Sequence, residues 1–262
     1  MSAEDFMVNR LITMGDKEVT QINFPKFADI VFQPLPGCID YDATGYSLMY
    51  TSNYVDLGTG MTAEFLLRPR ITFSGDIGLQ AFTRAHINKY VDIAFATEGQ
   101  YRSFWASTTL PVFEVCRFVP ASPENLEYHE FLFGTDQDTG EPIKAFYAVN
   151  WGQVPFWEKS NRLLAIYTDG YSKCIWTKVT GVERTADPRV LKVTVAHALP
   201  KIAVEEIDVV AEFVYMRLAS DDCESEYTTS EVAQASMSFT EDADGAKYDP
   251  WTEAPVNYPK VP

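Results

Sequence analysis

In the second half of the chain, short runs of β-branched and aromatic residues are separated by turn residues. Three of these runs are Arg162–Thr168, Lys173–Val182 and Val190–Ala196. The first two are joined across Asp169-Gly170, and Asp-Gly between two apolar runs is a strong signal of a β-hairpin. The pattern therefore predicts a strand, a hairpin turn, a second strand, a loop and a third strand.

Three further runs follow towards the C-terminus. Ile207–Leu218 begins with nearly continuous apolar residues, which is typical of a buried strand. Cys223–Thr228 and Val232–Phe239 are more polar, and in the second of them polar and apolar residues alternate. These two runs predict strands that lie nearer solvent.

The first half of the chain has a weaker pattern. Thr44–Tyr54 and Ala63–Phe73 are suited to strands, and Pro69 within the second indicates an edge position or a bulge. Between Asp76 and His86 the apolar spacing fits a helix loosely, so we expect one short helix there.

The segment after this predicted helix has the pattern of another hairpin. Val91–Ala96 and Tyr101–Trp105 are apolar and aromatic runs, and the turn-forming residues Thr97–Gln100 separate them.

These elements predict a mainly β protein, built from antiparallel β-sandwich or barrel domains with at most one or two short helices. The chain has 262 residues, of which 46% are hydrophobic and 14% aromatic, so it has ample material for packed cores. We expect a β-rich region over residues 1–100, a sandwich or barrel domain over 101–240, and an extended acidic tail over 241–262.

Charge argues against two classes of partner. The chain has 21 basic and 37 acidic residues, a net charge of -16. Phosphate backbones and anionic lipid headgroups would repel such a chain, so we expect neither nucleic acid nor a membrane surface as a partner. Much of this charge is local, because residues 220–253 contain ten acidic residues and one basic residue.

The N-terminal segment and the cysteines indicate an unsecreted protein. Residues 1–16 contain acidic residues before the first basic one and no long apolar stretch, so we expect no signal peptide. None of the four cysteines forms a close pair, and we expect reduced, mostly buried thiols. A metal site that joins distant cysteines with His86, His129 or His197 is the alternative.

The sequence contains few motifs that indicate catalysis or the binding of a cofactor or metal. Gly58–Ala63 matches a dinucleotide-binding glycine pattern, but Pro69 follows too soon for a useful helix, which favours a glycine turn between strands. Asp136–Glu141 places oxygens at alternate positions but lacks the complete calcium-loop pattern, which favours a polar turn. Acid pairs such as Asp40 and Asp42 are expected by chance among 37 acids. We therefore expect no enzyme, no cofactor and no metal.

A cluster of aromatic residues has two interpretations. Seven rings fall within about thirty residues, and they either fill a β core or form a face that stacks against sugars. The seven are Tyr147, Trp151, Phe156, Trp157, Tyr167, Tyr171 and Trp176.

Two stretches of the chain have a pattern that is typical of a known family. The first is Arg102–Thr108, with Phe113 and Val115 following it. The second is the hairpin series that ends in Leu199-Pro200, continued by the strands that include Arg217–Asp221. Together they cover roughly half of the chain, and they resemble tail-tip and baseplate proteins of long-tailed bacteriophages.

The resemblance implies a structural subunit at the distal end of the tail tube, in contact with hub, tube or distal tail proteins. It also implies a homo-oligomeric ring and a location in the virion tail tip after synthesis in the host cytoplasm. A β-sandwich module that binds a receptor glycan is the alternative function. The candidate interface residues are Phe104, Trp105, Arg217, Asp221, Trp251 and Tyr258.

Overall fold

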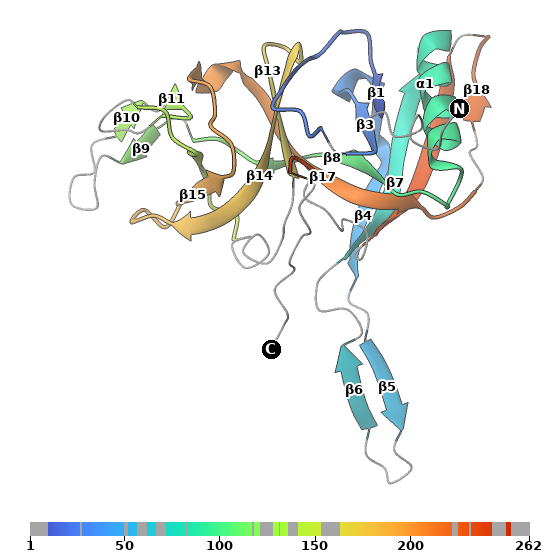
Figure 1. Ribbon diagram of the computed structural model, residues 1–262, viewed down its shortest axis with the longest axis horizontal. Helices are drawn as coiled ribbons and strands as arrows, with labels where there is room; N and C mark the ends of the chain where they lie inside the picture. The colour runs from blue at the N-terminus through green and yellow to red at the C-terminus, as the bar shows by residue number, and fades with distance from the viewer. Residues whose placement is uncertain are drawn as a thin grey trace. The chain divides into compact units, whose positions relative to one another are not determined.

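The computed structural model shows a mainly β protein, which confirms the predicted class (Figure 1). Most of its strands belong to one mixed sheet, and the described residues contain one α-helix. The structure describes residues 10–26, 28–49, 52–56, 62–66, 72–81, 83–116, 118–120, 128–130, 132–135, 141–152, 163–221, 225–230, 232–242 and 250–252.

The chain forms two compact units, and each is built from segments that are far apart in the sequence. The first unit takes residues 1–14, 26–106 and 215–262, and the second takes 15–25 and 107–214. Two strands, β8 (Phe104–Phe113) and β17 (Ile207–Leu218), continue from one unit into the other.

The first unit contains the α-helix and the strands that follow the N-terminus. Besides the helix and parts of β8 and β17, its elements are β1 (Arg10–Met14), β3 (Ile30–Pro34), the 3-10 helix η2 (Pro36–Cys38), β4 (Ile39–Met49), β5 (Ser52–Asp56), β6 (Thr62–Leu66), β7 (Thr72–Ala81), β18 (Ser225–Tyr227) and β19 (Ala233–Glu241). In its part of the sheet, β19 pairs with β7, β17 and β18, and β7 also pairs with β4.

The helix of the first unit, α1, spans Arg84–Thr97 and packs against β1, β3 and β7. The short helix predicted between residues 76 and 86 is therefore wrong, because Ile77, Leu79 and Ala81 alternate as inward positions of a strand. The hairpin predicted around residues 97–100 is also wrong. Residues 91–96 alternate between apolar and polar or small side chains, but they lie within the helix.

The second unit contains the hairpin series of the sequence analysis. Besides parts of β8 and β17, its elements are β2 (Thr20–Ile22), β9 (Phe118–Pro120), β10 (Tyr128–Glu130), β11 (Leu132–Phe133), β12 (Ala145–Val149), β13 (Leu163–Thr168), β14 (Lys173–Arg184), β15 (Val190–Val195), β16 (Ile202–Ala203) and the 3-10 helix η3 (Val204–Glu206). Its central strand is β13, which pairs with β14 on one side and β17 on the other and is buried throughout.

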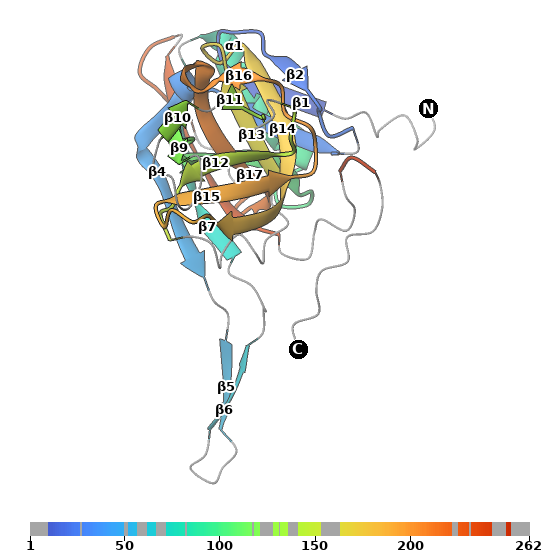
Figure 2. The ribbon, with the colours of Figure 1, turned by 90° about the vertical axis from the view of Figure 1, so that its left-hand side faces the viewer.

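The predicted series of three strands is confirmed as β13, β14 and β15, which lie side by side (Figure 2). Positive φ angles at Asp169 (59°) and Gly170 (61°) turn the chain between the first two strands. The aromatic core of this unit includes the fully buried Trp176, whose ring centroid lies 4.4 Å from that of Phe213.

The sheet is mixed, so the prediction of purely antiparallel domains is wrong. β1 pairs parallel with β3, β3 with β8, and β2 with β14. Parallel neighbours need a crossover connection, and β2 and β3 pair with strands that come much later in the chain. Within the described residues the sheet is not closed into a barrel.

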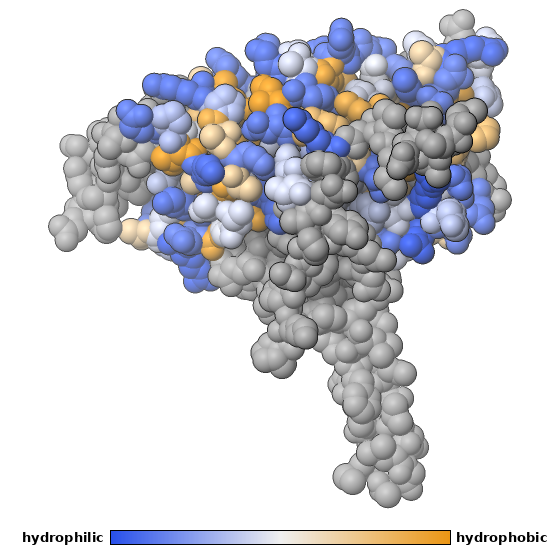
Figure 3. All heavy atoms as spheres, viewed as in Figure 1, coloured by the Kyte–Doolittle hydropathy of each residue, from blue (hydrophilic) through white to orange (hydrophobic). Residues whose placement is uncertain are grey.

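The surface carries both polar and apolar residues, which are interspersed on the face shown in Figure 3. In the described part of the chain, no helix has the length and apolar character needed to cross a membrane.

The acidic tail predicted over 241–262 lies largely outside the described residues.

Candidate interaction surface

The helix α1 exposes large apolar side chains on its outer face. Phe95 is 76% exposed and Val91 is 40% exposed. Residues four positions apart lie on the same face of a helix, so these two side chains form one apolar strip. Tyr101, in the turn that follows the helix, is 77% exposed.

The opposite face of α1 is fixed in the first unit by buried contacts. Ile87 and Ile93 are buried, and the hydroxyl of the buried Tyr90 donates to the backbone oxygen of Ser236 over 3.3 Å. The Thr97 hydroxyl donates to the backbone oxygen of Ile93 over 2.9 Å. The exposed strip is therefore presented by an anchored helix.

Both ends of the helix have defined caps. The Thr83 hydroxyl accepts a hydrogen bond from the backbone N–H of His86 at the start. At the other end, Glu98 adopts a left-handed conformation with φ of 52°, and its N–H donates to the backbone oxygens of Ala94 and Phe95. These caps fix where the chain leaves the helix towards Tyr101.

The turn after the helix is tied to the segment that follows β17. The backbone N–H of Gln100 donates to Asp221 Oδ1 over 2.7 Å, and its side-chain amide donates to the backbone oxygen of Ala219 over 2.7 Å. The backbone N–H of Arg102 donates to the Thr97 oxygen over 2.9 Å. The position of Tyr101 is thus set by bonds on both sides of it.

A second polar group lies beside this turn and centres on Asp242. Its Oδ2 accepts hydrogen bonds from the Ser103 hydroxyl over 2.6 Å and from Arg217 Nη2 over 3.0 Å. The Asp242 side chain is 14% exposed, so the ion pair is partly shielded from water.

Tyr215 packs against the same group. Its ring centroid lies 5.0 Å from that of Trp105. Burial raises the pKa of the Tyr215 phenol to about 12, and the nearby carboxylates of Asp29 and Asp242 add to this rise. The neutral phenol is therefore the form that the folded protein favours.

The structure places the six predicted interface residues in different environments. Phe104 is 0% exposed and Trp105 is 7% exposed, so both rings fill the core and present little surface to a neighbour. Arg217 and Asp221 bond within the first unit, to different partners. Trp251 is half-buried, and Tyr258 lies outside the described residues.

Sequence reasoning missed the exposed strip on α1. The signal was present, because the buried positions 87, 90, 93 and 97 recur at helical spacing and leave Val91 and Phe95 on the other side. It was hidden because two of the inward positions of the helix, His86 and Thr97, are polar.

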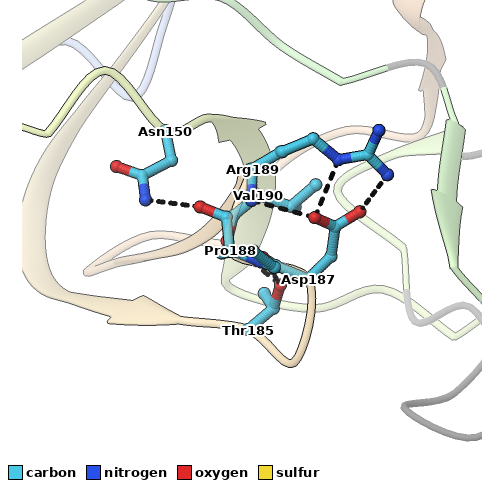
Figure 4. A network of polar contacts seen from close by, with 6 residues as sticks. All are labelled: Asn150, Thr185, Asp187, Pro188, Arg189 and Val190. Carbon is cyan, nitrogen blue, oxygen red and sulfur yellow. Dashed lines mark hydrogen bonds and ion pairs between the residues drawn. The ribbon is translucent and has the colours of Figure 1, made fainter.

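A separate polar network in the second unit holds the turn between β14 and β15 (Figure 4). Asp187 is 8% exposed, and its carboxylate accepts hydrogen bonds from Arg189 Nε over 3.0 Å and Nη2 over 2.8 Å. The Thr185 hydroxyl donates to the backbone oxygens of Asp187 and Val190. These bonds lie within the turn, so the network is structural.

Two residues considered for a metal site, Cys38 and His86, lie close together. Cys38 Sγ lies 3.7 Å from His86 Nδ1, and both residues are buried. Among the described residues, no three His, Cys, Asp or Glu side chains are grouped to hold a metal ion. Burial raises the pKa of the Cys116 thiol to about 11, and Glu114 and Asp187 add to this rise.

The motifs considered for other functions are only partly described. The glycine pattern at 58–63 and the calcium-like loop at 136–141 lie mostly outside the described residues, as do Phe156 and Trp157. Within the aromatic cluster, Tyr167 and Trp176 are buried, whereas Trp151 is 51% exposed.

Comparison of the sequence with models of known protein families and with curated proteins gives no match.

Proposed function

We propose that this chain is a structural component of a bacteriophage tail tip or baseplate. It is made in the host cytoplasm and joins other tail proteins in the virion, as part of a homo-oligomeric ring. The observation that carries the proposal is the outer face of α1, where an anchored helix presents Val91 and Phe95, with Tyr101 following.

The exposed rings have the chemistry of a subunit contact. Burying one large apolar side chain contributes about 1.5–3 kcal/mol, and aromatic residues dominate the energetics of many interfaces. Phe95 and Tyr101 expose 76% and 77% of their surfaces, so about three quarters of this free energy is available to a neighbour.

The resemblance supports the same assignment. The stretch that is similar to tail-tip proteins starts at Arg102, directly after the exposed Tyr101. In addition, the chain has a net charge of -16, which would attract a neighbouring subunit that has a basic surface.

Electron microscopy of phage particles that carry a labelled copy of the chain tests the assignment. We expect the label at the distal end of the tail. Absence of the chain from purified particles would overturn the proposal.

Substitution of the exposed ring tests the surface. We expect Phe95→Ser to lower incorporation into particles by about tenfold, equivalent to about 1.4 kcal/mol of lost contact energy. Its stability should change by less than about 0.5 kcal/mol, because the side chain is exposed. Tyr227→Ser removes another exposed ring, on β18, and is the matched control. Equal loss in both variants would contradict a specific role for α1.

A further inference from the structure

The second unit contains a pocket of about 360 Å³, a volume at the lower end of the range for small-molecule sites. Its lining residues include the exposed Trp151, the apolar residues Phe113, Val115 and Val204, and the acidic residues Glu114 and Asp208. No basic residue lines it in the part of the chain that the structure describes.

The apolar lining is continuous with the core of the second unit. Phe113 is a buried member of that core, and Val115 and Val204 pack against it. Val115 also forms a β-bridge with Ala148, which fixes the backbone that follows β8. The pocket therefore has a rigid, apolar wall.

The two acidic residues are anchored in different ways. The Asp208 carboxylate is held directly, because its Oδ2 accepts from the backbone N–H of Tyr171 over 2.7 Å. At Glu114 the main chain is held, since its backbone oxygen accepts from the N–H of Val149 over 2.8 Å. Both residues remain exposed, so a cation that enters the pocket meets two negative charges.

Trp151 is positioned by its neighbours. The Asn150 side chain accepts from the N–H of Gly152 over 2.9 Å and donates to the backbone oxygen of Pro188 over 2.7 Å, the second bond being drawn in Figure 4. Gly152 has φ of +85°, a conformation that favours glycine. The turn that carries the Trp151 ring is thereby fixed beside the acidic groups.

We propose that this pocket binds an arginine side chain from a basic segment of a partner protein. The aliphatic stem would lie on the apolar wall, while the guanidinium would stack on Trp151 and bond to the carboxylates of Glu114 and Asp208. The net charge of -16 favours such a partner. This proposal rests on the proposed function only for the identity of the partner.

The same ring and acids would also suit a sugar, but the wall argues against one. A saccharide buried against Phe113, Val115 and Val204 would leave hydroxyl groups without hydrogen-bond partners, which is unfavourable. The methylene groups of an arginine have no such requirement. The observations therefore favour the basic side chain.

The test is a calorimetric or NMR titration of the full chain with N-acetyl-arginine methylamide. The citrulline analogue, which has nearly the same shape and no charge, is the matched ligand. We expect saturable binding of the arginine compound, at least about tenfold weaker binding of the citrulline compound, and weakening of the first by salt. Equal affinity for the two compounds would overturn the proposal.

Two variants locate the site. Glu114→Gln and Trp151→Leu should each weaken arginine binding by about five- to tenfold. Glu183→Gln removes an exposed carboxylate on β14 that does not line the pocket, and it should have no effect.

Other outcomes decide against the proposal. If Glu183→Gln weakened arginine binding as much as the pocket variants do, the effect would come from the net charge of the protein and not from this pocket. Binding of a neutral oligosaccharide that Trp151→Leu abolishes, without arginine binding, would replace the proposal with a carbohydrate site. These titrations use the free chain, so their failure is separate from failure to find the chain in phage tails.

Discussion

At the scale of single residues, two structural features require glycine at position 99. Its φ is +65°, and a Cβ atom there would collide with the Asp221 carboxylate. We expect Gly99→Ala to lower the free energy of unfolding by at least about 1–2 kcal/mol. Gly37→Ala is the control, since nothing lies within 4 Å of its added carbon. Urea unfolding of both variants checks this, and similar small effects would contradict it.

The raised pKa of Tyr215 predicts that the free energy of unfolding depends on pH. The pKa of its phenol is raised from 10.0 to about 12, so its contribution to stability is complete below pH 10. Above pH 10 the unfolded chain loses this proton first. The contribution is therefore lost as the pH rises from about 10 through about 12.

The Tyr215→Phe variant isolates this effect, because the other groups titrate in both proteins. We expect the free energy of unfolding of the wild type to fall more steeply above pH 10 than that of the variant. Urea unfolding between pH 9 and pH 11.5 measures both slopes. Parallel curves would show that Tyr215 has an ordinary pKa.

At the scale of elements, the short strand β2 supplies a bond that the second unit needs. Trp176 is fully buried, and its Nε1 donates to Gln21 Oε1 over 2.6 Å. Gln21→Met keeps a similar shape but removes the acceptor. We expect it to cost about 1–3 kcal/mol of stability.

The matched control for Gln21 is Gln234→Met, at an exposed position on β19. Thermal unfolding should show little change in the control and a clear loss in Gln21→Met. No loss in Gln21→Met would mean that the indole N–H is satisfied in another way.

The elements differ in how well the sequence predicts them. Ile207–Leu218 was predicted with the observed bounds of β17, because a strand with sheet neighbours on both sides is largely buried and its sequence is correspondingly apolar. The alternation in Val232–Phe239 also predicted β19. The helix α1 was missed because its inward face includes polar residues, and the candidate surface on it was missed for the same reason.

At the scale of the whole molecule, the mainly β class could be predicted, but the pairing of remote segments could not. β1 and β3 pair parallel in the first unit, while β2 between them in sequence pairs with β14 in the second. No local pattern encodes these pairings, because β1 passes over its sequence neighbour and the partner of β2 lies about 150 residues further along the chain. For this reason, contiguous segments of sequence do not correspond to the compact units.

The most direct test of the account is site-specific photo-crosslinking in purified phage particles. A photoreactive amino acid replaces Phe95, and in a parallel chain it replaces Tyr227. The account predicts that position 95 crosslinks to a neighbouring tail subunit and that position 227 gives far less product. Chains that assemble into particles but crosslink equally at both positions, or at neither, would contradict a docking role for the outer face of α1.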